Sequence, residues 1–180
     1  CVASLPTSGI LCGSSQFGAP YGPSDLYVTT ETELPQNTFG YIGVQEVLLP
    51  SLRADVCGND IALLILNRNI NPSLAIPIVP RLDEPIEAGE LFTAVGYGHT
   101  GNGQGAGIRR TITNRYVICS GQNNGCQDGN QGVYENEWVG NNGTCEGDSG
   151  GPAIDEAGYV LGALSRGAQG CEYPVYSGVW

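Results

Sequence analysis

Residues 145–152 read Cys-Glu-Gly-Asp-Ser-Gly-Gly-Pro. In this stretch Ser149 lies among small residues, with an acidic neighbour and a cysteine just upstream, which indicates a nucleophile on a tight turn. The glycines leave room for a substrate carbonyl group and expose backbone N–H groups to it. A serine hydroxyl is a weak nucleophile until a neighbouring base removes its proton. The chain has a single histidine, His99, and its place in the sequence does not suit that task.

The composition limits the kind of protein. The 180 residues suffice for one large domain or two small ones. Seven Lys and Arg against 18 Asp and Glu give a formal net charge of -11. Nucleic acid and anionic membrane are therefore not expected as partners, because binding phosphates needs clustered positive charge. The longest apolar stretch, residues 61–66, is too short for a membrane helix.

The cysteines indicate a compartment. Seven Cys with 28 Gly and few charges suggest a secreted or extracellular protein with disulfide bonds, and a periplasmic location would fit as well. No C-x-x-C pair exists, and one His leaves few candidates to complete a zinc site, so we expect neither a metal nor another cofactor. The N-terminus lacks a signal-peptide pattern, so either a signal was removed or the sequence begins inside a longer protein.

Short β-branched and aromatic runs recur between Gly, Pro and Asn clusters, and helical periodicity is hard to find. This pattern is typical of an all-β barrel or sandwich. Gly-, Asn- and Gln-rich residues 101–107 and 120–132 are interpreted as surface loops, with a low-complexity linker as the alternative for the first. Residues 79–89 are the best candidate for a linker between two halves. The expected strands are residues 26–30, 38–49, 60–66, 91–97, 110–118, 159–165 and 174–180.

In order and spacing, five segments together resemble the chymotrypsin/trypsin-like serine proteases. They are the nucleophile signature at 145–152, the segment around the catalytic Asp at 58–64 (Gly-Asn-Asp-Ile-Ala-Leu-Leu), the Val-Gly-Tyr-Gly strand at 95–98, the cleft strand at 165–167 and the pocket-closing segment at 171–179. The resemblance implies two antiparallel Greek-key β-barrels that form one peptidase domain. Residues 1–82 would make the first barrel, incomplete here, and residues 83–180 the second.

The resemblance also implies a serine endopeptidase that hydrolyses peptide bonds through an acyl-enzyme on Ser149. The N–H groups of Gly147 and Ser149 would face the developing oxyanion, and such a donor can be worth about 10²–10³ in rate. Asp60 would be buried and would orient a His imidazole. Asp148 would pair with the amino group freed when the precursor is cut. The plain alternatives are a strand-start acid for Asp60 and an ordinary loop residue for Ser149.

The general base is missing from its expected place. The family's order is His, Asp, Ser, and no His precedes Asp60, while His99 is interpreted as a solvated loop residue. The family places a Cys directly after its catalytic His, and Cys1-Val2-Ala3 resembles the residues that follow that His. We therefore expect the base just upstream of Cys1, in a chain truncated at both ends. Such a piece should be nearly inert, because loss of a triad His costs on the order of 10⁶ in kcat.

The resemblance implies three disulfide bonds and leaves Cys1 over, with its partner in the missing part. Of these, Cys12–Cys57, which would tie an insertion to the strand bearing the catalytic Asp, has the least support from the family. The implied bonds are Cys12–Cys57, Cys119–Cys126 and Cys145–Cys171.

Substrate specificity is expected to depend on residues around the cleft. Gly143 lies six residues before Ser149, where the family sets the charge at the base of its pocket, so cleavage after Lys or Arg is not expected. With Ser165 in the cleft strand, Gly167 would leave the pocket entrance open and Val175 would narrow it. We expect a small or medium apolar side chain in the pocket.

Arg166 stands where an aromatic residue is usual beside the cleft. It would favour acidic substrate positions, or it is simply an exposed Arg. Residues 142–144, Asn-Gly-Thr, form a glycosylation sequon, but a glycan there would obstruct the pocket and is not expected.

Two other hypotheses compete with the serine protease. Residues 147–151 also match the G-x-S-x-G pattern of α/β-hydrolases, but Pro152 follows almost at once and no His lies after Ser149. The stronger rival is a protease homologue that has lost catalysis and serves as a protein-binding module, against which the intact Asp60, Gly147 and Ser149 argue. For the protease we expect polypeptide substrates, protein protease inhibitors as further partners, and a monomer.

Overall fold

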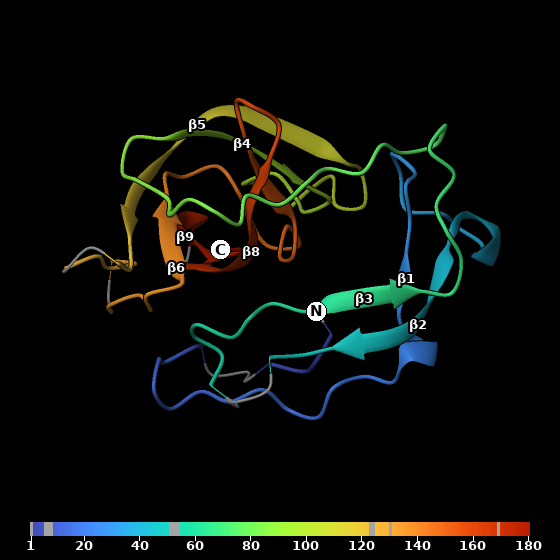
Figure 1. Ribbon diagram of the computed structural model, residues 1–180, viewed down its shortest axis with the longest axis horizontal. Helices are drawn as coiled ribbons and strands as arrows, with labels where there is room; N and C mark the ends of the chain where they lie inside the picture. The colour runs from blue at the N-terminus through green and yellow to red at the C-terminus, as the bar shows by residue number, and fades with distance from the viewer. Residues whose placement is uncertain (1, 6–8, 51–54, 123–124, 130, 169) are drawn as a thin grey trace.

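The computed structural model describes residues 2–5, 9–50, 55–122, 125–129, 131–168 and 170–180. Its strands form two β units that lie side by side (Figure 1). Strands β1 to β3 make an open sheet, and strands β4 to β9 close into a barrel. Among these residues the helical segments are two 3₁₀ turns, Pro23–Asp25 and Thr38–Gly40, and no helix is long and apolar enough to cross a bilayer. The chain has the all-β fold that its sequence predicts.

The barrel has the strand order β4-β5-β6-β9-β8-β7, and all neighbouring strands are antiparallel. Sequence neighbours are separated where β6 pairs with β9 and β4 pairs with β7, which is a Greek-key arrangement. Closure of the barrel leaves no free strand edge. The six strands are β4 Leu91–Gly96, β5 Arg110–Ser120, β6 Glu137–Gly140, β7 Pro152–Asp155, β8 Val160–Ala168 and β9 Glu172–Gly178.

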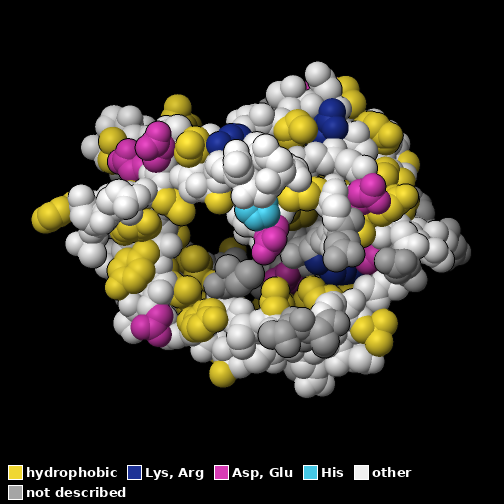
Figure 2. Space-filling model, turned by 180° about the vertical axis from the view of Figure 1, so that it is seen from behind, with side chains coloured by type: hydrophobic (Ala, Val, Ile, Leu, Met, Phe, Trp, Pro, Cys, Tyr) yellow, Lys and Arg dark blue, Asp and Glu magenta, His cyan; other side chains and the backbone are white. Residues whose placement is uncertain are grey.

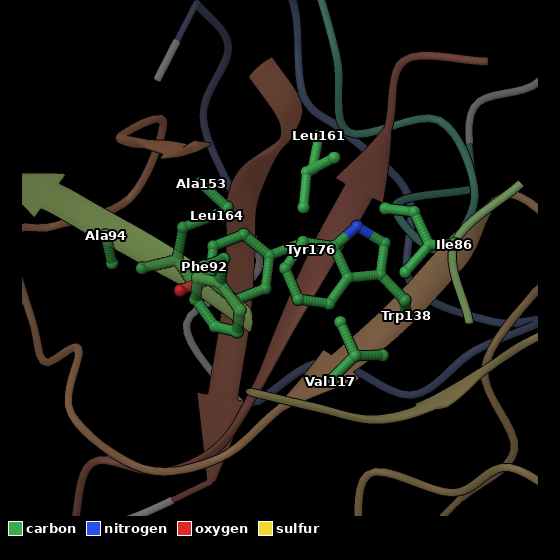
Figure 3. Close-up of a cluster of buried hydrophobic side chains, with 9 residues drawn as sticks. All are labelled: Ile86, Phe92, Ala94, Val117, Trp138, Ala153, Leu161, Leu164 and Tyr176. Carbon is green, nitrogen blue, oxygen red and sulfur yellow. The ribbon is translucent and has the colours of Figure 1, made fainter. Parts of the chain in front are cut away.

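Aromatic rings fill the centre of the barrel. Trp138 stacks on Tyr176 with ring centroids 4.2 Å apart, and Phe92 meets both rings edge-on at 5.0 and 5.5 Å. Figure 3 shows these rings surrounded by aliphatic side chains from β4, β5, β7 and β8. Burial of such large apolar side chains is the main stabilising contribution to the barrel.

The open sheet consists of β1 Tyr27–Val28, β2 Ile42–Leu48 and β3 Leu63–Leu66, with β2 in the middle. Its strands are antiparallel. On β3 the apolar Leu63 and Ile65 are 64% and 42% exposed. This sheet is the incomplete first barrel that the sequence leads us to expect.

Two strands of the barrel were not predicted from the sequence. β6 and β7 have four residues each, and one begins with a charged residue and the other with a proline. Residues 38–40, predicted as the start of a strand, form a 3₁₀ turn in which Asn37 Oδ1 accepts a hydrogen bond from the Phe39 N–H. The other predicted strands are present with shifted ends.

The predicted linker contacts the barrel. The Val160 N–H donates to Val79 O at 3.0 Å, and the Arg81 N–H donates to Val160 O at 2.9 Å. Arg81 also forms ion pairs with Glu90 and Asp155. Residues 79–81 therefore pair with Val160, the first residue of β8. A boundary between residues 82 and 83 would fall between β3 and β4, and it stays a proposal.

Three disulfide bonds join the pairs that the resemblance implies: Cys12–Cys57, Cys119–Cys126 and Cys145–Cys171. The first holds the turn that precedes Asp60, and the third ties the turn that carries Ser149 to the start of β9. Cys1, which we expect to be left over, lies outside the described residues.

The barrel core predicts a large difference between two phenylalanines. Phe92 is 2% exposed and Phe39 is 90% exposed. Phe92→Ala should lower the free energy of unfolding by about 3–5 kcal/mol, because it leaves a cavity in the aromatic cluster. Phe39→Ala should change it by less than about 0.5 kcal/mol. Urea unfolding followed by Trp fluorescence measures both, and equal midpoints for the two variants would contradict this assignment of the core.

Candidate active site

The loop between β6 and β7 carries Ser149 on a turn closed by backbone hydrogen bonds. The Asp148 N–H donates to Cys145 O at 3.0 Å, and the Gly151 N–H donates to Asp148 O at 2.8 Å. Gly147 has φ +91°, and a Cβ there would lie 2.9 Å from Gly98 Cα. Only glycine fits this backbone conformation and this close approach. The turn leaves Ser149 exposed.

The backbone N–H groups of Gly147 and Ser149 have no hydrogen-bond acceptor among the described residues. The intervening N–H of Asp148 is bonded to Cys145 O. A pair of free N–H groups beside a serine hydroxyl can stabilise a developing oxyanion. Gly147 and Ser149, which the sequence predicts for the oxyanion hole, thus lie on the same turn.

The Asp148 carboxylate is held by backbone groups. Its Oδ1 accepts from the Gly98 N–H at 2.7 Å, and its Oδ2 accepts from the Cys145 N–H at 2.8 Å. A Cβ at Gly98 would lie 2.6 Å from Asp148 Oδ1, and a Cβ at Gly96 would overlap the same oxygen. The Gly-Tyr-Gly motif therefore makes room for this carboxylate. No cation pairs with Asp148 in the described part of the chain, so the predicted ion pair with a freed amino group stays a prediction.

Asp60 lies in the turn before β3, and its Oδ2 accepts a hydrogen bond from Ser165 Oγ at 2.8 Å. Ser165 is on β8 and is 4% exposed. Burial raises the pKa of Asp60 above its ordinary value, while the Ser165 hydroxyl and the nearby Arg166 lower it. The negative charge of Glu137 adds to the increase in pKa. Two residues predicted for the site, one from each half, are in direct contact.

Asp60 and Ser149 line one cavity of about 430 Å³. Its other lining residues are mostly apolar and come from both β units, among them Phe17, Leu64 and Leu164. A cavity of this size with a few polar groups is typical of a binding site. The described residues contain no group of three or more His, Cys, Asp or Glu that could hold a metal ion.

His99 lies close to the nucleophile turn. Its backbone N–H donates to the backbone oxygen of Glu146 at 3.1 Å, and its ring Nε2 is 3.6 Å from Glu146 Oε2. The side chain is 26% exposed, which is less than a solvated loop residue would show. Figure 2 shows the single His side chain at the edge of a hollow. No hydrogen bond joins either ring nitrogen of His99 to Ser149, so His99 is not placed to act as the general base for Ser149.

The predicted specificity residues are near the nucleophile turn or on β8 and β9. Gly143 has φ +146°, and a Cβ there would lie 2.9 Å from Ile112 Cδ1, so a larger residue would meet packed side chains. Val175 on β9 is fully buried, and Gly167 on β8 is exposed. Burial raises the pKa of Tyr176 far above its ordinary value, although the Thr144 hydroxyl lowers it. Thr144 and Tyr176 are polar groups near this turn for which the sequence predicts no role in the site.

Arg166 differs from its sequence interpretation, because it is neither an exposed cation nor free to bind an acidic side chain. Its side chain is 6% exposed, and its Nη1 and Nη2 donate to the two carboxylate oxygens of Glu137 at 2.5 and 3.0 Å. Glu137 is fully buried on β6. Glu137 is not predicted from the sequence, where its one signal is a charged residue beside the apolar Trp-Val pair at 138–139.

The closed antiparallel barrel beside a partial sheet is the fold of the trypsin-like serine proteases. The family model described as Trypsin matches residues 20–180. The chain belongs to the trypsin family. It is similar to a solved structure titled "Structure of GrC", with 26% identity, a TM-score of 0.63, and coverage of 77% of this chain and 64% of that chain. The chain thus spans less than two thirds of that structure's length. The search of curated proteins found no match to this chain.

The space around Asp148 predicts an effect of Gly98. Gly98→Ala should lower the free energy of unfolding by about 1–3 kcal/mol, because the new methyl group would overlap the Asp148 carboxylate and Glu146 O. Gly101→Ala, on the same loop, is the matched control, since nothing lies within 4 Å of its added Cβ. Thermal unfolding of both variants measures the difference. Equal melting temperatures would show that the Gly-Tyr-Gly motif does not enclose Asp148.

The pKa of Asp60 predicts a pH-dependent effect on stability. The folded-state pKa is raised above 3.8, so the folded state holds the proton more tightly and loses stability as pH rises above 3.8. Asp60→Asn removes this loss while its Oδ1 still accepts from Ser165. The variant should therefore be more stable than the wild type at pH 7, with the difference shrinking toward pH 3. Urea unfolding of both proteins at the two pH values tests this. A stability gain over the wild type that is smaller at pH 7 than at pH 3 would refute it.

Proposed function

We propose that this chain is the greater part of a serine endopeptidase that hydrolyses peptide bonds through an acyl-enzyme on Ser149. The observation that carries the proposal is that Asp60 and Ser149, from the two β units, line one cavity. On the turn of Ser149, the N–H groups of Gly147 and Ser149 are free of other acceptors and could donate to a substrate oxyanion. Membership of the trypsin family supports the same reaction class.

In the proposed mechanism, Ser149 Oγ attacks the carbonyl carbon of the scissile peptide bond while a general base takes its proton. The Gly147 and Ser149 N–H groups donate to the oxyanion that forms. The base then protonates the leaving amine, and the acyl-enzyme forms. Water attacks the ester carbon while the same base takes its proton. The C–Oγ bond then breaks as the base returns that proton to Ser149 Oγ, which releases the acid.

The proposed base is a His that directly precedes Cys1. Asp60, held by Ser165, would accept a hydrogen bond from its imidazole and stabilise the imidazolium. A carboxylate in a largely buried place acts on a neighbouring cation more strongly than it would in water. His99 does not take this role, because its neighbour is Glu146 and no hydrogen bond joins it to Ser149.

We propose polypeptide substrates with a small or medium apolar side chain in the pocket. Gly143 provides no charge at the proposed pocket base, and Val175, Gly167 and Ser165 would shape the walls and the entrance. Arg166 would line the cleft through its backbone on β8, because its charge is paired with Glu137. Asp148 would still pair with a freed amino group on activation.

The three disulfide bonds are typical of extracellular proteins, so we propose a secreted location, with the periplasm as a variant. Protein inhibitors that occupy the cleft would be further partners, and we propose that the enzyme acts as a monomer.

Labelling of the parent protein with a fluorophosphonate tests the function. Ser149 Oγ should attack the phosphorus and displace fluoride, so that mass spectrometry finds the adduct on Ser149. Ser149→Ala should abolish labelling, Asp60→Asn should slow peptide hydrolysis by about 10⁴ in kcat, and the exposed Ser73→Ala should change nothing.

A folded, processed parent protein that leaves Ser149 unlabelled would contradict the proposal and favour a binding homologue without catalysis. A residue other than His directly before Cys1 in the parent gene would have the same consequence.

A further inference from the structure

Glu137 is the largest fully buried charged residue described, and the mechanism above gives it no role. Its carboxylate accepts four hydrogen bonds. Oε1 accepts from the Gly58 N–H at 2.9 Å and from Arg166 Nη1 at 2.5 Å. Oε2 accepts from the Tyr134 N–H at 2.9 Å and from Arg166 Nη2 at 3.0 Å. Every acceptor direction of this side chain is thus used, and the bidentate Arg pair fixes its orientation.

The donors lie on both sides of the Asp60–Ser165 contact. Gly58 is two residues before Asp60, and Arg166 directly follows Ser165. The Glu137 carboxylate therefore connects the peptide segment that carries Asp60 to the strand that carries its hydrogen-bond donor. The two segments belong to different β units.

The turn before Asp60 is bound from a second direction. Asn136 Nδ2 donates to Gly58 O at 2.6 Å, so both backbone groups of Gly58 bond to the residues at the start of β6. A Cβ at Gly58 would lie 3.0 Å from Asn136 Oδ1 and 3.1 Å from Tyr134 Cβ, which shows how closely the two segments pack.

Arg166 also contacts the disulfide bond that holds this turn. Arg166 Nη2 lies 3.5 Å from Cys12 Sγ, and Cys12 is bonded to Cys57. Arg166 Nε is also 3.7 Å from Asp128 Oδ2. The guanidinium thus contacts Glu137 on β6, the disulfide bond of this turn, and Asp128 in the loop between β5 and β6.

Stability alone is a weak reason for such a pair. Removing two charges from water is expensive, and apolar residues of similar volume often give an equally stable or more stable fold. What a buried, bidentate pair provides better than apolar packing is a fixed distance and direction between the groups that it joins. Here those groups flank the side chain proposed to orient the base.

We propose that Glu137 and Arg166 are positioning residues that hold Asp60 against Ser165 in the orientation that catalysis requires. Neither contacts the reacting atoms; both act through the backbone of Gly58 and of β8. The inference rests on the proposed function, because it assigns a role within that reaction.

Steady-state kinetics of the parent protein on a peptide substrate test the role. Glu137→Gln and Arg166→Gln should each lower kcat about 10- to 100-fold with KM within twofold of wild type, since small misplacement of a catalytic group can cost about 10². The double variant should be no slower than the slower single variant, because the two side chains act as one unit. Arg81→Gln is the matched control, since it breaks the ion pairs with Glu90 and Asp155 beside the first residue of β8 and should leave kcat unchanged.

Amide hydrogen exchange of this chain gives a second readout that needs no activity. Exchange at residues 55–61 should be at least about tenfold faster in both Gln variants, with the β4 and β5 amides unchanged. An active wild type with variant kcat values within twofold, or a kcat loss of the same size in Arg81→Gln, would overturn the positioning role alone. Unchanged exchange at residues 55–61 would overturn it as well. An inactive, unlabelled wild type would instead contradict the proposed function.

Discussion

The carboxylate of Asp148 fixes the turn on which Ser149 lies, and much of the site depends on it. Its two oxygens bond to the N–H groups of Gly98 and Cys145, which joins the end of β4 to the start of the nucleophile turn. The carboxylate fits only because Gly96 and Gly98 have no side chains. With Asp148 held in this way, the turn directs the N–H groups of Gly147 and Ser149 away from the protein's own acceptors. The Asp148 carboxylate thus determines both the shape of the turn and the availability of its donors.

The second half of the site depends on charge pairing between distant segments. The chain has only seven Lys and Arg residues, and Arg166 and Arg81 are both bound to internal carboxylates. Among the described residues no cation is in direct contact with Asp60, which instead has the hydroxyl of Ser165. Its raised pKa is the expected result, because one neutral donor offsets burial only in part. A carboxylate in this condition contributes little to stability, and in the proposed mechanism it would bind a transient imidazolium.

Local patterns were sufficient to predict most of the fold. Alternating runs predicted β4, β5 and β8, and the family's motifs predicted the segments that hold Asp60, Asp148 and Ser149. β6 and β7 escaped prediction because their four residues contain Glu137 and Pro152, which are unfavourable in isolated strands. Their stability comes from cross-strand pairing within the closed barrel, which no local pattern contains.

The charged residues were the hardest to predict, for the same reason. In sequence Arg166 lies between Ser165 and Gly167 and reads as a surface residue of the cleft. Its partner Glu137 is on another strand, and only pairing of β6 and β8 with β9 brings the two side chains together. A buried ion pair leaves no mark in composition or periodicity, because each residue alone looks solvent-exposed. Motifs can therefore indicate which residues carry out the chemistry, whereas the residues that hold them in place become visible only when the strands are assembled.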